Sequence, residues 1–258
     1  MQRYFVSDDA TDFRDRIVIM GDDYHHIVHV MRMPVGTRVE IGHNGKIYIA
    51  EIDEITLDHV DLHVAEKLQT QDIAFQLTLY QGLPKGEKID LILRQACEIG
   101  VTRIVIFEAD HSVARLSSDK REGRLVRWRK IAKEAAEQAK RTRVPDVHFV
   151  SSLEIALATD NSSLLLVPYE LQGHALPSIR DVLAAQLPVL LPSHENQPLS
   201  ISFVIGPEGG FSLREIEWFS QQRVGHLLTL GARILRTETA GIVVATIILY
   251  ELNQMGVT

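Results

Sequence analysis

The sequence has few of the features that would assign it to a secreted, membrane-bound or metal-binding class. Its one cysteine, Cys97, excludes an internal disulfide and any site built from several thiolates. The histidines of residues 25–29 have no carboxylate or thiol at ligand spacing, so we expect no metal site. The longest apolar run, residues 240–250, is about half of the roughly 20 residues that a membrane span needs. No long apolar stretch follows Met1, so we expect a cytoplasmic protein without a membrane anchor.

The chain also lacks the overall positive charge of a nucleic-acid coat, since its net charge is −7. Its basic residues are nevertheless concentrated: residues 115–143 hold 11 Lys and Arg against 4 Asp and Glu, which gives a local charge of +7. Screening confines the field of such a segment to about 8–10 Å, so a basic ridge on an acidic body can bind phosphates. A solvated helix face is the alternative that charge alone leaves open.

The first 70 residues predict a small β-rich domain. Residues 37–52 alternate apolar and polar side chains around Asn44-Gly45, which is a strong hairpin signal. The other expected elements are strands at 3–6, 16–20 and 59–67 and a helix at 22–32 that is capped near Asp22. Many short strands in a small space are typical of a compact barrel. The polar residues 66–72 predict a linker to the rest of the chain.

From Ile73 the pattern changes to an alternation of strands and helices. We expect strands at 74–83, 103–108, 147–150, 163–167, 201–205 and 226–230, and helices at 87–99, 118–140, 153–158, 213–222 and 238–252. Continuous apolar strands separated by helices predict an α/β domain whose mostly parallel sheet is covered by helices on both faces. The prolines of residues 187–199 predict an exposed loop there.

Three loops that follow strands in this second part are candidates for a ligand pocket. They are Val167–Glu170, Gly206–Phe211 and Leu230–Ala240. Glycines let a ligand approach the backbone, and open α/β sheets bind ligands at the carboxyl ends of their strands. The loops can therefore build a main-chain pocket for a flat polar ligand such as a nucleoside. Plain strand-to-helix turns are the alternative, and Ser212 and Glu215 form a capping-box pattern where the second loop ends.

Two arginines, Arg233 and Arg236, interrupt the otherwise apolar third loop. A guanidinium offers forked donors that remain charged, so Arg236 is suited to hold a phosphate or to polarise a carbonyl. Structural ion pairs of both arginines, for example with Glu238, are the alternative. The glycine spacing of a dinucleotide-binding loop is absent, which disfavours a nicotinamide-dependent oxidoreductase.

Taken together, these motifs resemble the ribosomal RNA small-subunit methyltransferase E family (RsmE), which belongs to the SPOUT superfamily. The resemblance covers nearly the whole chain, in order. It is carried by Arg3–Val6, His26–Arg32, Lys85–Lys88, Glu98–Val101, Arg127–Ala132, Glu137-Gln138, Gly206–Phe211 and Leu230–Ala240. Each motif is weak alone, and the combination is specific. The turn Asp110–Val113 departs from the family pattern, in which a more basic strand exit is expected.

The resemblance implies a SPOUT domain at residues 73–258, threaded into a trefoil knot, after a PUA-like β-barrel at residues 1–72 that helps to grip RNA. It also implies a homodimer whose knot loops bind S-adenosylmethionine near the dimer interface. The reaction would be methylation of N3 of a uridine in the decoding region of 16S ribosomal RNA, either as free RNA or in the small ribosomal subunit. The alternatives are a SPOUT enzyme acting on another RNA or base atom, and an RNA-binding assembly factor without catalysis.

Residue roles follow from the same resemblance. Uridine N3 must lose its imide proton; a cation near the developing oxyanion would assist this step, and a carboxylate can accept the proton. Arg236 and Glu208 are the expected catalytic residues, with Glu238 as an alternative acceptor. The expected cofactor-binding residues are Val167, Pro168, Tyr169, Glu170, Gly206, Pro207, Glu208, Gly209, Gly210, Leu230, Gly231, Arg233, Ile234, Leu235, Arg236, Thr237, Thr239 and Ala240. The expected RNA-binding residues are Arg3, Arg32, Lys85, Lys88, Arg129, Lys133, Lys140, Arg141 and Arg143.

Overall fold

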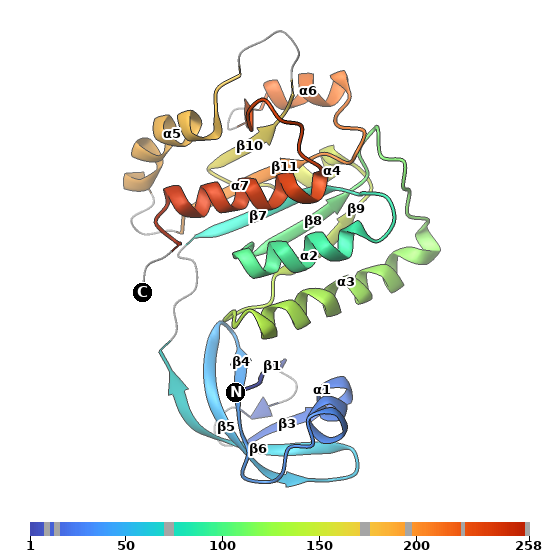
Figure 1. Ribbon diagram of the computed structural model, residues 1–258, viewed down its shortest axis with the longest axis vertical. Helices are drawn as coiled ribbons and strands as arrows, with labels where there is room; N and C mark the ends of the chain where they lie inside the picture. The colour runs from blue at the N-terminus through green and yellow to red at the C-terminus, as the bar shows by residue number, and fades with distance from the viewer. Residues whose placement is uncertain are drawn as a thin grey trace. The chain divides into compact units, whose positions relative to one another are not determined.

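The chain forms two compact units, each built around its own sheet (Figure 1). The computed structural model describes residues 1–7, 11–12, 16–69, 75–170, 176–193, 198–222 and 225–255. The first unit comprises Met1–Asp72 and Lys133–Val144, and the second comprises Ile73–Ala132 and Pro145–Thr258. Within the described ranges, no helix is both long and apolar enough to span a bilayer.

The first unit is a curled sheet of six strands with one short helical segment. The strands are β1 Arg3–Phe5, β2 Thr11–Asp12, β3 Arg16–Met20, β4 Arg38–His43, β5 Lys46–Ile55 and β6 His59–Leu68. Their order is β1-β4-β5-β6-β3-β2, with β1 parallel to β4 and the other pairs antiparallel. Helix α1 (Gly21–His25) continues into the π-helical turn η2 (His26–Val30), which buries Ile27 in the core between the strands.

The predicted hairpin and the three other predicted strands of this unit are confirmed. Asn44 and Gly45 form the turn between β4 and β5 with φ of 48° and 74°, a conformation that Asn and Gly adopt most readily. Two details of the prediction are wrong. The first helix begins at Gly21 with Met20 at its cap instead of Asp22. The backbone of residues 66–68 still pairs with β5, so these residues belong to β6, and residues 70–72 lie outside the described residues.

The end of α3 (Ser118–Gln138) belongs to the first unit from Lys133 onward. The Nζ atom of Lys133 lies 2.6 Å from each carboxylate oxygen of Asp23 and 3.0 Å from Glu137. Glu137 in turn accepts a hydrogen bond from the backbone N–H of Phe5 at 3.3 Å. Burial would lower the pKa of Lys133, but the two carboxylates raise it, so the lysine remains charged and ties the helix end to this unit.

The second unit is a six-stranded parallel sheet between helices. Its strands are β7 Gln76–Gly82, β8 Arg103–Phe107, β9 Asp146–Val150, β10 Leu164–Pro168, β11 Ser200–Ile205 and β12 Gly225–Leu228, in the order β12-β10-β11-β7-β8-β9. Its helices are α2 Lys88–Ile99, the first part of α3, α4 Leu153–Leu157, α5 Ile179–Ser193, α6 Leu213–Ser220 and α7 Thr237–Glu251. The parallel sheet with helices that the strand-helix alternation predicted is confirmed.

Helices cover both faces of this sheet, which explains why its strands are apolar throughout. Alternate strand residues such as Tyr80 and Val105 pack against α4 and α6 in one core. The other face is covered by α2 and α7, which lie in front of the sheet in Figure 1. Helix α3 also contributes to the core, because Trp128 is 1% exposed and Ala132 is fully buried.

One other prediction for this unit is wrong. Residues 187–193 continue helix α5 through Pro188 and Pro192 instead of forming a loop. Ile179, Val182 and Leu183 are buried and anchor one side of this helix, so tertiary packing outweighs the helix-breaking tendency of proline. The N-cap of α7 is Arg236. The capping box of Ser212 and Glu215 at the start of α6 is confirmed.

Candidate functional site

Three loops of the second unit meet at one edge of its sheet. Strands β10, β11 and β12 are parallel and end at Pro168, Ile205 and Leu228, so their carboxyl ends face the same way. The loops after β10 and β12 line a pocket of about 130 Å³. Its lining residues are Pro168, Tyr169, Glu170, Thr229, Leu230, Gly231, Arg233, Ile234, Leu235 and Ala240. All but Thr229 are among the predicted cofactor-binding residues.

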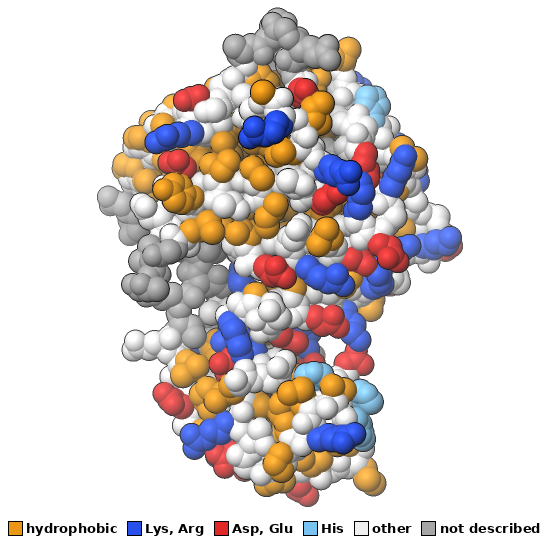
Figure 2. Space-filling view, in the orientation of Figure 1, with side chains coloured by type: hydrophobic (Ala, Val, Ile, Leu, Met, Phe, Trp, Pro, Cys, Tyr) orange, Lys and Arg blue, Asp and Glu red, His pale blue; other side chains and the backbone are white. Residues whose placement is uncertain are grey.

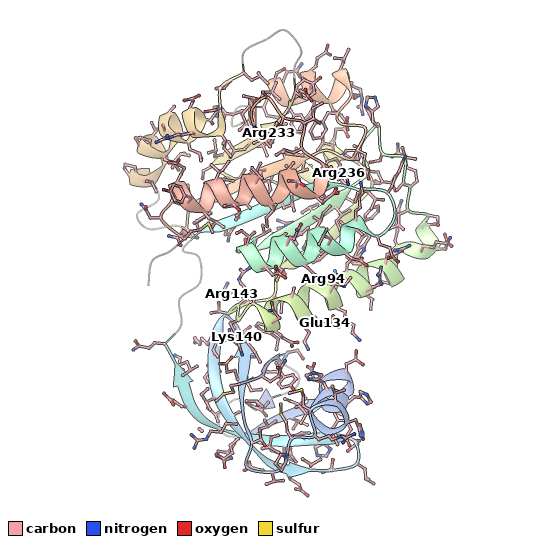
Figure 3. All side chains as sticks on the ribbon, viewed as in Figure 1. Arg94, Glu134, Lys140, Arg143, Arg233 and Arg236 are labelled. Atoms are coloured by element: carbon pink, nitrogen blue, oxygen red, sulfur yellow. The ribbon has the colours of Figure 1, made fainter. Side chains whose placement is uncertain are left out.

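The pocket combines apolar walls with an accessible backbone and two charged groups. Gly231 has a φ of +101°, which disfavours any residue with a side chain, and open space lies where a side chain would begin. Glu170 and Arg233 are both exposed and bring opposite charges to the rim. Figure 3 shows Arg233 and Arg236 on the segment that leads into α7. The missed residue, Thr229, accepts a hydrogen bond from the N–H of Gly231 at 3.1 Å. A polar residue directly before Leu230-Gly231 could have signalled it.

The other predicted cofactor residues lie outside the lining of this pocket. Val167 is fully buried in the core. The loop Gly206–Gly210 is joined to the start of α7 by Thr237, whose hydroxyl donates to the carbonyl of Gly206 at 2.7 Å. Gln81, near the end of β7, extends this series of hydrogen bonds. Its amide Nε2 donates to Thr237 Oγ1 and to the carbonyl of Gly82, each at 2.9 Å. Sequence reasoning missed Gln81, a polar residue in an otherwise apolar strand.

Gly82 fixes the position of the same loop by its lack of a side chain. A Cβ atom on Gly82 would lie 2.6 Å from Cδ and 2.7 Å from the backbone N of Pro207. Neither a proline ring nor a backbone nitrogen can rotate away. Strand β7 and the loop after β11 therefore pack backbone against backbone.

Two predicted site residues, Glu208 and Lys88, are paired with each other. Lys88 Nζ lies 2.9 Å from Glu208 Oε1, and the N–H of Lys85 donates to both oxygens of Glu208 at 3.3 Å. Burial would raise the pKa of Glu208, but the hydrogen bond and charge of Lys88 and nearby backbone N–H groups hold it below its usual value. Lys88 also lies 3.7 Å from Glu238. Glu238 therefore pairs with Lys88, and not with an arginine of the third loop, which was the alternative left open by the sequence.

The turn after β8 holds the loop after β11 from its other side. Asp110 accepts hydrogen bonds from Ser212 Oγ at 2.6 Å and from Arg214 at 2.7 Å, and Arg214 also bonds Glu154 at 2.7 Å. The hydrogen bond from Arg214 is the main cause that lowers the pKa of Asp110. The ring of His111 lies 3.1 Å from the carbonyl oxygen of Gly209. This turn, which departed from the expected pattern, is thus a structural support of the loop.

Residues 71–249 match the RNA methyltransferase domain, and residues 19–65 match the RNA methyltransferase PUA domain. The chain is 34% identical over 266 residues to ribosomal RNA small subunit methyltransferase E of Bacillus subtilis, covering 97% of each chain. The chain belongs to this methyltransferase family. The predicted family and its enzyme class are confirmed.

Other relatives of the family agree. Ribosomal RNA small subunit methyltransferase E 2 of Borreliella burgdorferi is 29% identical, with 84% of each chain covered. The crystal structure of a protein described as hypothetical matches with a TM-score of 0.81 at 32% identity, over 98% of this chain and 100% of that one. The Neisseria gonorrhoeae family member bound to S-adenosyl methionine has a TM-score of 0.78 at 22% identity, over 97% and 98% of the two chains, and shows the shared fold. The predicted fold class, an α/β RNA methyltransferase domain with a parallel sheet after a PUA-like domain, is confirmed.

Several of the predicted RNA-binding residues in this family member are engaged within the first unit. Arg3 is only 5% exposed, and it pairs with Glu40 at 2.9 Å and donates to the carbonyl of Arg141 at 2.7 Å. Lys140 bonds the same Glu40 at 2.8 Å and also contacts the carbonyl of Met1. Arg141 is itself 7% exposed. With Lys133 on Asp23, these cations hold the N-terminal strand and the end of α3 together.

The remaining predicted RNA-binding residues are more accessible. Arg32, Lys85 and Arg143 are exposed, and the ion pairs found in the described ranges do not include them. The guanidinium of Arg143, labelled in Figure 3, packs against Gly45 in the hairpin turn and occupies the space that a Cβ atom would need there. Arg129 on α3 is exposed and donates from Nε to the carbonyl of Val147 at 3.3 Å. Among the residues that the structure describes, no group of three or more His, Cys, Asp or Glu could hold a metal ion.

Proposed function

We propose that this chain uses S-adenosylmethionine to methylate 16S ribosomal RNA at N3 of a uridine in the decoding region. The observation that carries the proposal is the backbone-lined pocket at the carboxyl ends of β10 and β12, inside the region that matches the RNA methyltransferase domain. The names of the relatives support a small-subunit ribosomal RNA substrate. The Neisseria gonorrhoeae neighbour bound to S-adenosyl methionine supports the cofactor. The target atom follows from the family resemblance.

The chemistry of the pocket fits S-adenosylmethionine. Leu230 and Ile234 offer apolar surface for an adenine ring, and Glu170 can accept hydrogen bonds from ribose hydroxyls or from the amino group. Arg233 can pair with the carboxylate, and the open backbone at Gly231 lets the ligand approach closely. When bound, the cofactor supplies an electrophilic methyl group. We assign the remaining predicted cofactor residues, in the loop after β11 and the first turn of α7, to the wall next to this pocket.

Arg236 and Glu208 are the residues to which we assign the chemical step. Loss of the N3 proton places negative charge on the uracil carbonyl oxygens, and a guanidinium near them stabilises that charge. The Glu208 carboxylate can accept the proton, but Lys88 and nearby backbone N–H groups lower its pKa, which makes it a weak base. The oxyanion stabilisation by Arg236 therefore carries most of this step.

Nucleoside mapping of ribosomal RNA tests the proposal. In a strain that lacks the gene, mass spectrometry should find one uridine of 16S RNA without its N3 methyl group, and complementation should restore it. A methyl group lost from another RNA or base atom would favour the other SPOUT activity. Unchanged methylation, together with no binding of S-adenosylmethionine in calorimetry, would favour an assembly factor.

Each unit contributes exposed cations that we assign to RNA phosphates. In the first unit they are Arg32 and Arg143, and in the second they are Lys85 and Arg129. The match of residues 19–65 to a PUA domain of RNA methyltransferases supports a role for residues 1–72 in RNA binding, with residues 73–258 as the catalytic domain. The more enclosed cations of the first unit, such as Arg3, do not contact RNA in this proposal and act only by stabilising the fold of that unit.

Arg143→Ala is expected to reduce the salt dependence of RNA binding. A phosphate contact releases counterions, so its loss lowers the slope of log K against log salt by about 0.7–0.9. The measurement is a titration of 16S ribosomal RNA at several salt concentrations. Arg38→Ala is the matched control, because Arg38 is exposed in the same unit but pairs with Glu51 at 3.1 Å. An unchanged slope for Arg143→Ala would mean that this side chain is only solvated.

We also propose that the chain forms a homodimer through the outer face of α7. Residues 239–250 of this helix contain no charged residue. The face opposite its buried side presents Val243 and Ile247, both partly exposed, and Tyr250, which is 69% exposed. Figure 2 shows hydrophobic side chains gathered on the second unit over this helix. A second copy of the same face would cover them without placing charge against charge.

Ile247→Lys is expected to weaken this dimer at least about thirtyfold, because a central apolar contact contributes about 2 kcal/mol or more to binding. Sedimentation equilibrium over a range of concentrations measures the change. Val126→Lys is the control, since Val126 is a 57% exposed apolar residue on α3 of the same unit. A wild-type chain that sediments as a monomer, or equal dissociation of both variants, would contradict the assignment.

We propose further that the C-terminal segment is threaded as a trefoil knot and that the protein acts in the cytoplasm, where ribosomal RNA is available. The course of the chain supports the threading. After the edge strand β12 it returns to the centre of the sheet, where Thr237 bonds Gly206 and Gln81. A crystal structure of this chain would test the threading, and fractionation of cells would test the compartment.

A further inference from the structure

Lys88 stands between two carboxylates that come from different segments of the proposed active site. Its Nζ lies 2.9 Å from Glu208 Oε1, in the loop after β11, and 3.7 Å from Glu238 Oε2, in the first turn of α7. Lys88 is itself the first residue of α2. One ammonium group therefore joins three elements of the second unit by charge.

Glu238 depends on this ammonium group. Its Oε2 atom is buried, and no hydrogen-bond partner for it exists among the residues described. The whole side chain is only 15% exposed. A carboxylate oxygen that lacks both water and a hydrogen bond is stabilised mainly by the nearest opposite charge. That charge is Lys88.

A second cation, Arg236, is the N-cap residue of α7, two positions before Glu238. The hydrogen bond from Lys88 to Glu208 is the main cause that raises the pKa of Lys88, and the positive charge of Arg236 acts in the opposite direction. The guanidinium of Arg236 is exposed and forms no ion pair or hydrogen bond within the described part of the chain. Both carboxylates, Glu208 and Glu238, therefore pair with Lys88, while Arg236 on the adjoining segment pairs with neither.

We propose that Lys88 is a positioning residue that keeps Arg236 available for the substrate. While Lys88 holds Glu208 and Glu238, neither carboxylate turns to the guanidinium. An arginine that is paired with a carboxylate has its donors occupied and its charge largely cancelled, so it stabilises a developing oxyanion poorly. The inference rests on the proposed role of Arg236 in methyl transfer and adds the residue that keeps this arginine unpaired.

Four variants test the inference: Lys88→Met, Lys88→Arg, Glu238→Gln and the double variant Lys88→Met with Glu238→Gln. The substrates are S-adenosylmethionine and small ribosomal subunits from the deletion strain. Lys88→Met should lower kcat by about tenfold to thirtyfold, less than direct removal of an oxyanion donor. The KM for S-adenosylmethionine and the affinity for RNA should change by less than about twofold, because Lys88 contacts neither in this proposal. Lys88→Arg should recover most of the activity, because it retains the charge.

The double variant separates this role from direct contact with the substrate. Without Lys88, Glu238 is free to pair with Arg236. The double variant, in which Glu238 is an amide, should therefore have a kcat at least about threefold higher than that of Lys88→Met. Recovery is partial because Glu208 remains. A lysine that itself bound phosphate or uracil would leave the double variant no more active than Lys88→Met, and that result would overturn the proposal.

Other outcomes are equally decisive. A normal kcat in Lys88→Met, or an effect confined to KM, would also overturn the inference. If Lys88→Met melts at a lower temperature than wild type, Lys88→Gln serves for the same comparison. If the wild-type enzyme is inactive on small subunits, the proposed function itself is contradicted. If Arg236→Ala is fully active, Arg236 has no role in methyl transfer and the inference loses its basis.

Discussion

Replacing Arg236 with alanine is expected to lower kcat for methyl transfer by about 10²–10³-fold, the usual effect of removing one donor from a developing oxyanion. The affinity for RNA should change by less than about threefold, because one exposed cation among several contributes little to binding. The structure supports this expectation because the Arg236 guanidinium is exposed beside the pocket loop. Single-turnover methyl transfer and RNA titration on the same preparation measure the two quantities.

Arg94→Ala is the matched control for this experiment. Arg94 is an exposed arginine on α2 of the same unit, labelled in Figure 3, and it lies outside the pocket lining. Its replacement removes the same charge from the unit, so it should leave kcat unchanged. Equal activity of Arg236→Ala and wild type would remove Arg236 from the mechanism, and equal losses in both variants would point to a general effect of charge.

Gly82→Ala is expected to reduce kcat/KM by about 10²-fold, because a displacement of about 1 Å in a catalytic loop has an effect of this size. The φ of Gly82 lies outside the left-handed region, so the backbone itself accepts alanine. The added Cβ would lie 2.7 Å from the backbone N of Pro207, and the loop that carries Glu208 must therefore move. Overpacking of this kind also lowers the free energy of unfolding by about 1–3 kcal/mol. Methyl transfer and thermal denaturation measure the two effects.

Gly123→Ala is the control for the added methyl group. Gly123 lies in α3, with open space where its side chain would begin, so alanine should leave activity intact and stabilise the helix by up to about 1 kcal/mol. If Gly82→Ala retains full activity, the contact between β7 and the loop after β11 does not position the catalytic group.

Arg236→Ala and Gly82→Ala both test a site whose loops are held in place by elements far away in the sequence. Beneath the loop after β11, Gln81, Thr237 and Gly206 form a hydrogen-bonded chain that is largely buried. Above it, Lys88 binds two carboxylates. The loop is thus held by β7, α2 and α7 together, which explains how a glycine-rich segment keeps its position.

Sequence patterns located most of the fold because these elements are locally consistent. The Asn44-Gly45 hairpin, the strand-helix alternation after Ile73 and the capping box at Ser212 each have a short-range physical cause, and each is confirmed. The pattern failed where tertiary contacts outweighed local preference. Helix α5 continues through Pro188 because its buried side anchors it, and residues 66–68, which were expected in the linker, belong to β6 because β5 continues beside them.

For the site, the sequence identified loops better than individual roles. The loops at residues 168–170 and 230–235 do line the pocket, because residues after parallel strands must meet at one edge of a sheet. The sequence separated the predicted RNA-binding residues less well. Arg3, Lys133 and Lys140 bind carboxylates of the first unit, a distinction that charge counting cannot make. Gln81 and the turn at Asp110 were missed as supports, since their partners lie more than 100 residues away.

By itself the sequence determined the family, most of the strands and helices, and the strand ends at which a pocket forms, because periodicity, turn chemistry and motif order are local properties of the chain. Only the tertiary structure decided which charges are paired and which remain open to a substrate. Pairing depends on distances between segments that are remote in sequence and on how far burial removes water from them. For this reason Lys88 and Arg236, two ordinary cations in the sequence, differ in the folded protein: Lys88 is paired with two carboxylates and Arg236 is exposed.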